Sequence, residues 1–183
     1  ASAVSTGGAF NFAPSSLDAT PDPRFLETSM YAHADAQANW LTTLSSYSDW
    51  VGPRIHLVIV DTEEYKSDQA VYYPETTTEV NPRIKLGRGI GRNLRNLISD
   101  PEPVKHELMH HWVFRYMPTV SGESVILHEG LADAFVMLAT KNSCLAENIC
   151  PSGGSMCISE QCLRSADNTL NYTGTLPSTP HRK

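Results

Sequence analysis

The stretch that most restricts how this chain can fold carries an H-E-x-x-H motif between two prolines. It opens on Asp100-Pro101, an acid that can cap a helix and a proline suited to the first helical turn. His106 and His110 are four residues apart, so a helix places both imidazoles on one face. The stretch therefore predicts a helix from about Glu102 to Tyr116 with two histidines one turn apart.

Two imidazoles placed in this way can bind one zinc ion, each at about 2.0–2.1 Å. Glu107 lies one step round the helix, where it can reach a zinc-bound water without being a ligand itself. Zinc lowers the pKa of such a water to about 7, and a carboxylate can take its proton and pass it to a leaving group. We therefore predict Zn²⁺ as the cofactor and Glu107 as the base, provided that the chain supplies a third zinc ligand.

The third ligand has to come from farther along the chain. Val113 and Tyr116 stand where a metzincin motif has Gly and His, and the reversed H-x-x-E-H order is absent. A second helix, expected from about Gly122 to Thr140, supplies Glu129 and, one turn later, Asp133. The eighteen residues between His110 and this glutamate allow the first helix to end and a second to return antiparallel. Glu129 can then ligate zinc, and Asp133 can accept the other ring N–H of a bound histidine.

The two motifs, HELMHHW and LHEGLADAF, together resemble those of the gluzincin metallopeptidases, in which H-E-x-x-H is followed by a glutamate on the next helix. The gap, Trp112 and Glu129-Gly130 are similar to aminopeptidase N-type enzymes, while the spacing of Glu129 and Asp133 is similar to thermolysin-like enzymes. The resemblance covers residues 100–137. It implies zinc ligands, a base and a supporting carboxylate at His106, His110, Glu129, Glu107 and Asp133. It also implies that an extended substrate adds as an antiparallel strand along an edge strand at 83–87.

The resemblance leaves the donor to the oxyanion open. The family takes a Tyr or His for this role from well downstream, and Tyr172 and His181 are the residues of these types after Glu129. Tyr172 is the favoured candidate, and the alternative that zinc alone fills the role remains. The aminopeptidase motif G-x-M-E-N, whose Glu holds the free amino group of the substrate, is absent. The pattern therefore favours cleavage of internal bonds.

The two motifs contain two more histidines and several apolar residues. His111 is expected to be a surface or second-layer residue, because it lies about 100° round the helix from His110. His128, directly before Glu129, is a candidate to line a cleft. The apolar residues expected in the core are Leu108, Trp112, Leu127, Leu131, Phe135 and Leu138.

The N-terminal half predicts one helix and a small sheet. Apolar residues at helical spacing predict a helix from Arg24 to Tyr47, and the β-branched run at 55–61 predicts a buried strand. The segment 83–87 alternates apolar and basic residues, which predicts a half-exposed edge strand. The glycine-rich segment 87–93 lacks the spacing of a phosphate-binding loop and is expected to be a turn.

Composition and cysteine usage restrict which partners the protein can bind and which cellular compartment it can occupy. A net charge of −6 argues against a nucleic-acid partner, and no apolar run is long enough to span a bilayer. All four cysteines fall within residues 144–162 without a C-x₂-C pair, which predicts two disulfides and an oxidising compartment. Asn171 begins a glycosylation sequon. We expect a secreted protein, extracellular or periplasmic.

These observations predict an α+β, zincin-like fold in a single catalytic domain over 1–183. One lobe, about 1–118, would hold a mixed sheet and the motif helix, and a small helical lobe, about 119–183, would be stapled by disulfides. The predicted function is that of a zinc metalloendopeptidase, with a peptide or protein as its partner. Two alternatives remain: a zinc-containing binding module that keeps the fold without catalysis, and an aminopeptidase. The sequence does not predict an oligomeric state.

Overall fold

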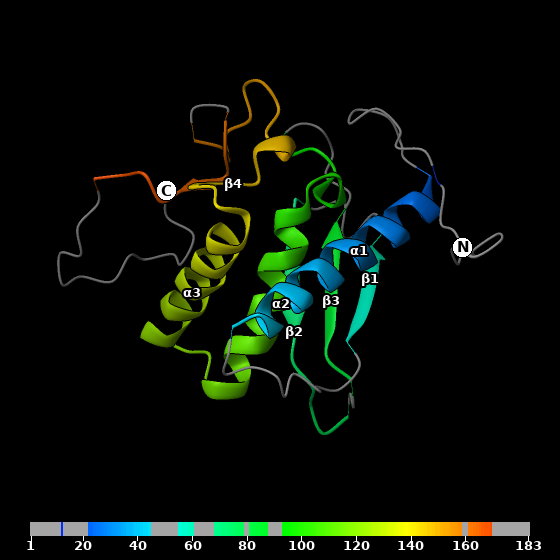
Figure 1. Cartoon of the computed structure of the whole chain (residues 1–183), viewed down its shortest axis with the longest axis vertical. Helices are drawn as coiled ribbons and strands as arrows, with labels where there is room; N and C mark the ends of the chain where they lie inside the picture. The colour runs from blue at the N-terminus through cyan, green and yellow to red at the C-terminus, as the bar shows by residue number, and fades with distance from the viewer. Residues whose placement is uncertain are drawn as a thin grey trace.

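The computed structural model describes residues 12, 22–44, 55–60, 68–78, 81–87, 93–158 and 161–169. Helices lie on one face of a small sheet, and a disulfide-linked segment follows the last helix (Figure 1). No helix within these ranges is both long and apolar enough to cross a membrane.

The sheet has three strands in the order β1-β3-β2, formed by β1 (His56–Val60), β3 (Arg83–Gly87) and β2 (Ala70–Tyr73). Strand β3 pairs parallel with β1 and antiparallel with β2, so the predicted mixed sheet is confirmed. The prediction that 83–87 is an edge strand is wrong, because β3 is paired on both sides. Its apolar residues Ile84 and Leu86 are fully buried, and β2 takes one edge of the sheet.

Two helices cover one face of this sheet, α1 (Pro23–Thr42) and α2 (Pro101–Tyr116) (Figure 1). Each begins with an aspartate side chain, Asp22 or Asp100, that accepts a backbone N–H of the first turn ahead of a proline, and the start at Asp100 is the one predicted. The last part of the predicted 24–47 helix, from residue 45 on, lies outside the described residues. Residues from both helices, the sheet and the segment before α2 form one core, which includes Leu26, Met30, Leu41, Ile84, Leu86, Ile98, Val104, Leu108 and Met109.

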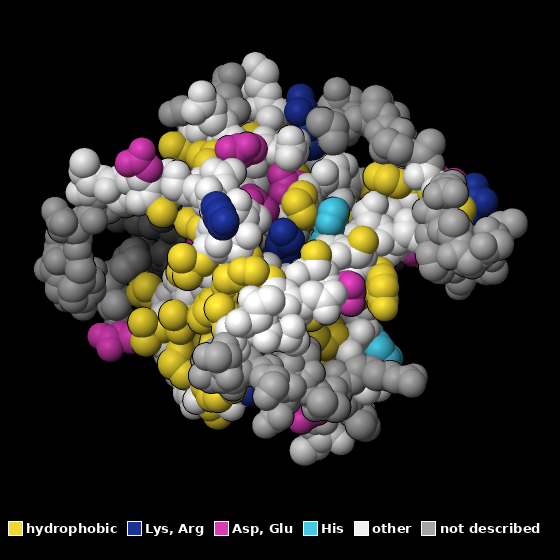
Figure 2. Space-filling model, in the orientation of Figure 1, with side chains coloured by type: hydrophobic (Ala, Val, Ile, Leu, Met, Phe, Trp, Pro, Cys, Tyr) yellow, Lys and Arg dark blue, Asp and Glu magenta, His cyan; other side chains and the backbone are white. Residues whose placement is uncertain are grey.

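Helix α3 (Glu123–Thr140) returns antiparallel beside α2, and its Phe135 ring meets the Trp40 ring of α1 (Figure 1). It buries His128, Ala132 and Val136. The prediction that Leu127, Leu131 and Leu138 belong to the core is wrong, since they are 53%, 38% and 65% exposed. One face of α3 packs on α2, and no second layer among the described residues covers the other, where apolar side chains gather on the surface (Figure 2). Leu108 and Trp112 are buried and Phe135 is partly buried, as predicted.

The segment after α3 is held by two disulfides, Cys144–Cys162 and Cys150–Cys157, as the clustering of the cysteines predicts. It contains the 3-10 helix η3 (Glu147–Ile149) and a two-stranded ladder of β4 (Cys144–Leu145) and β5 (Arg164–Ser165). The N-terminus of α2 anchors it, because Glu102 accepts the backbone N–H of Ala146 and Asp100 accepts that of Asn148. A second 3-10 helix, η2 (Leu97–Ser99), leads into α2. The disulfide segment is thereby fixed against the helix that carries the H-E-x-x-H motif.

Candidate metal centre

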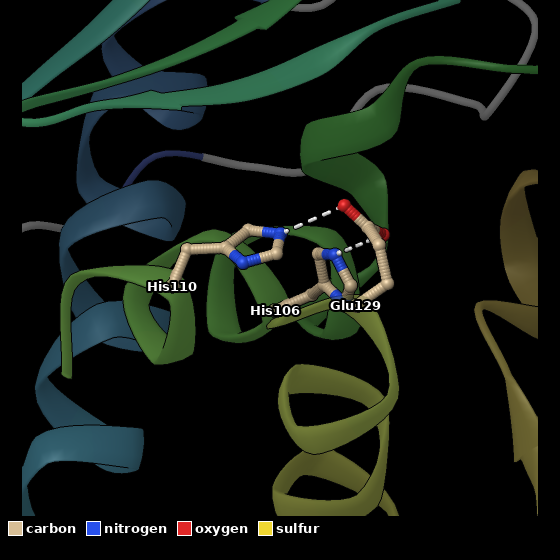
Figure 3. A group of neighbouring side chains, drawn as sticks. All are labelled: His106, His110 and Glu129. Atoms are coloured by element: carbon tan, nitrogen blue, oxygen red, sulfur yellow. Dashed lines mark ion pairs between the residues drawn. The ribbon is translucent and has the colours of Figure 1, made fainter. Parts of the chain in front are cut away.

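Three side chains predicted as ligands come together between α2 and α3 (Figure 3). His106 and His110 project from successive turns of α2, and the carboxylate of Glu129 faces them from α3. The Nε2 atom of His106 lies 3.4 Å from one carboxylate oxygen, and the Nε2 atom of His110 lies 3.3 Å from the other. Among the described residues, these three form the group of His, Cys, Asp and Glu side chains close enough to hold a metal ion.

The spacing of the donor atoms fits a tetrahedral metal. For ligands at about 2.0–2.1 Å, the edge of a tetrahedron is about 3.3 Å long. The two distances between the imidazole nitrogens and the carboxylate match this edge. Two imidazoles and a carboxylate are also a donor set that occurs in catalytic zinc sites with a fourth position left open.

His106 is oriented by a residue outside the donor set. Its Nδ1 atom lies 2.8 Å from Asp133, so the ring N–H points to that carboxylate and Nε2 is left to face the metal position. Asp133 is held in turn by Arg164, whose Nε and Nη2 atoms donate to its two oxygens over 2.6 and 2.7 Å. Asp133 therefore lies between the ring of His106 and the guanidinium of Arg164.

Sequence reasoning missed Arg164. It stands two residues after Cys162 on β5, and its Nη2 atom is 3.4 Å from Nδ1 of His106. No motif marks it, because it reaches the site only through the disulfide and the ladder between Leu145 and Arg164. Its position just after the last cysteine was the one available signal.

The charges of the ligand set depend on one another. Burial alone would lower the pKa of His106, but hydrogen bonds to Asp133 and Glu129 raise it to about 9. Burial alone would raise the pKa of Glu129, but hydrogen bonds from His106 and His110 hold it well below its usual range. A cation at this position therefore replaces a proton on His106 and faces a carboxylate that is already ionised.

Glu107 is buried beside the ligand set, with 5% of its surface exposed. Burial is the largest effect on its pKa and raises it, while nearby His106 and His110 and a hydrogen bond from the backbone N–H of Tyr72 lower it. Its carboxylate is thus held between the metal position and strand β2. A raised pKa suits a group that must accept and then release a proton near neutral pH.

A cavity of about 830 Å³ opens over these groups. Residues of β2, α2, α3 and the disulfide segment line it, with His106, Glu107, His110, His128, Glu129 and Arg164 among them. His128 lines the cavity as predicted, and its Nε2 atom is 2.9 Å from the backbone oxygen of Met117. Further lining residues are apolar: Leu94, Leu97, Phe114, Val120, Val125, Leu145, Ile149, Met156 and Leu163.

Among the described strands, β2 is the edge strand beside this cavity, the position predicted for 83–87. The backbone N–H of Gly87 donates to Gln69 over 2.8 Å, which makes that pair hydrogen-bonded in the antiparallel ladder. Because hydrogen-bonded pairs alternate with non-hydrogen-bonded ones, the backbone N–H and C=O of Ala70 and Tyr72 face away from β3. The predicted oxyanion candidates Tyr172 and His181 lie outside the described residues.

The chain matches no family model and no curated protein. Solved structures do match, among them the precursor of protealysin, a metalloproteinase from Serratia proteamaculans, with a TM-score of 0.57 at 15% sequence identity. That match covers 74% of this chain, and the chain spans 43% of the length of the protealysin precursor. The chain therefore shares the fold of that metalloproteinase precursor over the matched part, around a group that can hold a metal ion, and the predicted α+β fold class is to this extent confirmed.

Proposed function

We propose that this chain is a secreted zinc metallopeptidase of the gluzincin type that hydrolyses internal peptide bonds. The observation that carries the proposal is the arrangement at the metal centre. A buried carboxylate, Glu107, lies next to a donor set with tetrahedral spacing, and all of these groups line one cavity. A site that only stabilised the fold would have no use for a second, non-ligating carboxylate beside Glu129 in this cavity.

In this proposal His106, His110 and Glu129 hold the ion, and Asp133 fixes the ring of His106. Zinc in such a site acts as a Lewis acid and lowers the pKa of bound water. Glu107 takes the proton of the attacking water and delivers it to the nitrogen of the leaving amine. Its raised pKa and its burial beside the donor set support this role.

Arg164 is the candidate among the described residues for contact with the substrate oxygen. It is the one Lys or Arg side chain among the described residues that line the cavity. Asp133 accepts from its Nε and Nη2 atoms, which fixes the plane of the guanidinium. Tyr172 remains the other candidate for this role.

The cavity and the edge of β2 support a polypeptide substrate. An extended chain could pair with the outward-facing N–H and C=O of Ala70 and with the C=O of Tyr72, as an antiparallel strand added to the sheet. Apolar lining residues would accept its side chains. The two disulfides support an oxidising compartment and hence secretion. We propose one catalytic domain over 1–183, with lobes at about 1–118 and 119–183.

The test is cleavage of a denatured protein by the zinc-loaded chain, with and without a chelator. We expect chelator-sensitive cleavage, and a loss on the order of 10²–10⁴ in rate for Glu107→Gln with zinc content unchanged. Glu123→Gln, which alters an exposed acid on α3, is the matched control and should cleave normally.

Blocked peptides separate this proposal from its alternatives. An endopeptidase should cut N-acetylated and free peptides equally, at internal bonds located by mass. Removal of single residues from free peptides alone would identify an aminopeptidase. Bound zinc with no cleavage across a broad peptide library would identify a binding module.

A further inference from the structure

Tyr72 on β2 contacts two successive turns of α2. Glu107 and His111 are four residues apart and lie on the same face of α2. The hydroxyl of Tyr72 shares a hydrogen bond of 2.9 Å with Nδ1 of His111, and its backbone N–H lies close enough to the carboxylate of Glu107 to lower the pKa of that group. One residue of the edge strand therefore bonds to His111 and lines the same cavity as the proposed base, one turn away on α2.

The ladder of the sheet explains why Tyr72 can make both contacts. Tyr72 stands opposite Ile84 in a non-hydrogen-bonded pair, so its N–H is free of β3 and faces the open edge. Its side chain lies on the same face of the sheet as that of Ile84, which is fully buried under the helices. The backbone group thus reaches the cavity while the ring packs against α2.

The ring of Tyr72 is fixed on more than one side. It meets His111 edge-on, with 5.5 Å between ring centroids, and lies 6.3 Å from the ring of Phe114. His111 is buried, with 3% of its surface exposed. Strand β2, in contrast, has four residues and only β3 as its neighbour among the described strands. A short strand at the edge of a sheet needs such a second attachment to keep its position.

We propose that Tyr72 and His111 form a clamp that positions the Glu107 carboxylate. Their hydrogen bond holds β2 against α2, and the backbone N–H of Tyr72 in turn fixes the direction in which the carboxylate points. The inference rests on the proposed function, since it assigns a purpose to the orientation of the base. A displacement of about 1 Å of a catalytic group can cost on the order of 100-fold in rate, so such a clamp has a measurable effect.

Tyr72→Phe removes the hydroxyl and leaves the ring, the backbone and the zinc ligands in place. We expect kcat to fall on the order of tenfold while KM and zinc content stay close to wild type. Tyr73→Phe is the matched control, because the neighbouring side chain lies on the opposite face of β2, beside Arg83 and Lys85. It should retain normal kcat.

Variants of the histidine test the clamp from the other side. His111→Leu should lower kcat as Tyr72→Phe does, and the double variant should lose no more than either single one. His111→Asn, whose amide can still bond to the hydroxyl, should recover part of the rate. A merely structural role would predict losses that follow stability, without this recovery and without a change confined to kcat.

Hydrogen exchange gives a readout that does not need activity. In protein stripped of zinc, the backbone amide of Tyr72 should exchange faster in Tyr72→Phe and His111→Leu than in wild type or Tyr73→Phe. An unchanged kcat or an unchanged amide exchange in both clamp variants would overturn the inference. Absence of cleavage by the wild-type protein would overturn the proposed function instead, and the exchange of the Tyr72 amide would still decide whether the clamp exists.

Discussion

His106 uses the two nitrogens of one ring for different tasks. Nδ1 lies 2.8 Å from Asp133 and Nε2 faces Glu129, and together these carboxylates raise the pKa of the ring to about 9. At pH 7 the ring therefore carries a proton that a metal ion has to displace. The two carboxylates that orient the ligand also make the uptake of a metal depend on pH.

We expect zinc binding at pH 7 to release about one proton and to tighten as the pH rises towards 9. The sign follows from the raised pKa of His106. Before zinc binds, the protonated ring stabilises the fold below pH 6.5, and this contribution is lost as the pH rises through about 9. Calorimetric titration in two buffers of different ionisation enthalpy measures the released proton. A heat of binding independent of the buffer would contradict the prediction.

Asp133 can be tested by a change that keeps its shape. Asp133→Asn removes the charge that Arg164 and His106 share. We expect zinc affinity to fall about 10- to 100-fold, as it does when the partner of a metal-bound histidine is lost. Competition with a fluorescent chelator measures the affinity. Asp167→Asn, at an exposed position near β5, should bind zinc as wild type does.

At the scale of secondary-structure elements, the turn into α3 decides how Glu129 meets the histidines. Gly122 precedes the helix with φ +56° and ψ −127°, a conformation that is costly for residues with a side chain. Nothing lies within 4 Å of where a Cβ would stand, so any cost of substitution comes from the backbone alone.

We predict that Gly122→Ala lowers the free energy of unfolding by about 1–3 kcal/mol. Gly130 provides the opposite case, since it lies within α3 with equally open space around it. Gly130→Ala should raise the free energy of unfolding by roughly 0.5–1 kcal/mol through helix propensity. Urea denaturation of the two variants measures both values, and equal effects in the two would show that the backbone conformation of Gly122 is not strained.

The local sequence predicted where helices and strands form better than it predicted which elements pack beside one another. The motif helix was predictable because its cap, its first-turn proline and its histidines all lie within one stretch of chain. The edge position of β2 was not, because it depends on which strands pair with β3. The exposed face of α3 was missed since its leucines repeat at helical spacing, and only the packing of α2 decides which face is buried. The position of Arg164 at the metal centre could not be predicted, because it depends on which cysteines form the disulfides.

In the molecule as a whole, the disulfide Cys144–Cys162 connects the core to the metal centre. It links the start of β4 to the residue two before Arg164, and Arg164 holds Asp133. The other disulfide, Cys150–Cys157, closes a smaller loop, and the Sγ atom of Cys150 faces the backbone oxygen of Ala146. The two bonds should therefore differ in what their loss does to metal binding.

Replacing Cys144 and Cys162 by serine should lower the free energy of unfolding by about 3 kcal/mol and also weaken zinc binding. The same change at Cys150 and Cys157 should lower the free energy of unfolding by about 2 kcal/mol and leave zinc affinity near wild type. Denaturation and zinc competition on both double variants measure the two effects. Equal zinc affinities would show that the Cys144–Cys162 bond does not position Arg164.

The three proposed ligands span only 24 residues, from His106 to Glu129, whereas Arg164 is 58 residues from His106. Short loops close more easily than long ones, so the helical hairpin of α2 and α3 can assemble its donor atoms early in folding. The strand that carries Arg164 has to wait for oxidation of the cysteines. During refolding from the reduced state, zinc should therefore be captured before the disulfides form. Time-resolved zinc uptake that lags behind thiol oxidation would show the reverse order.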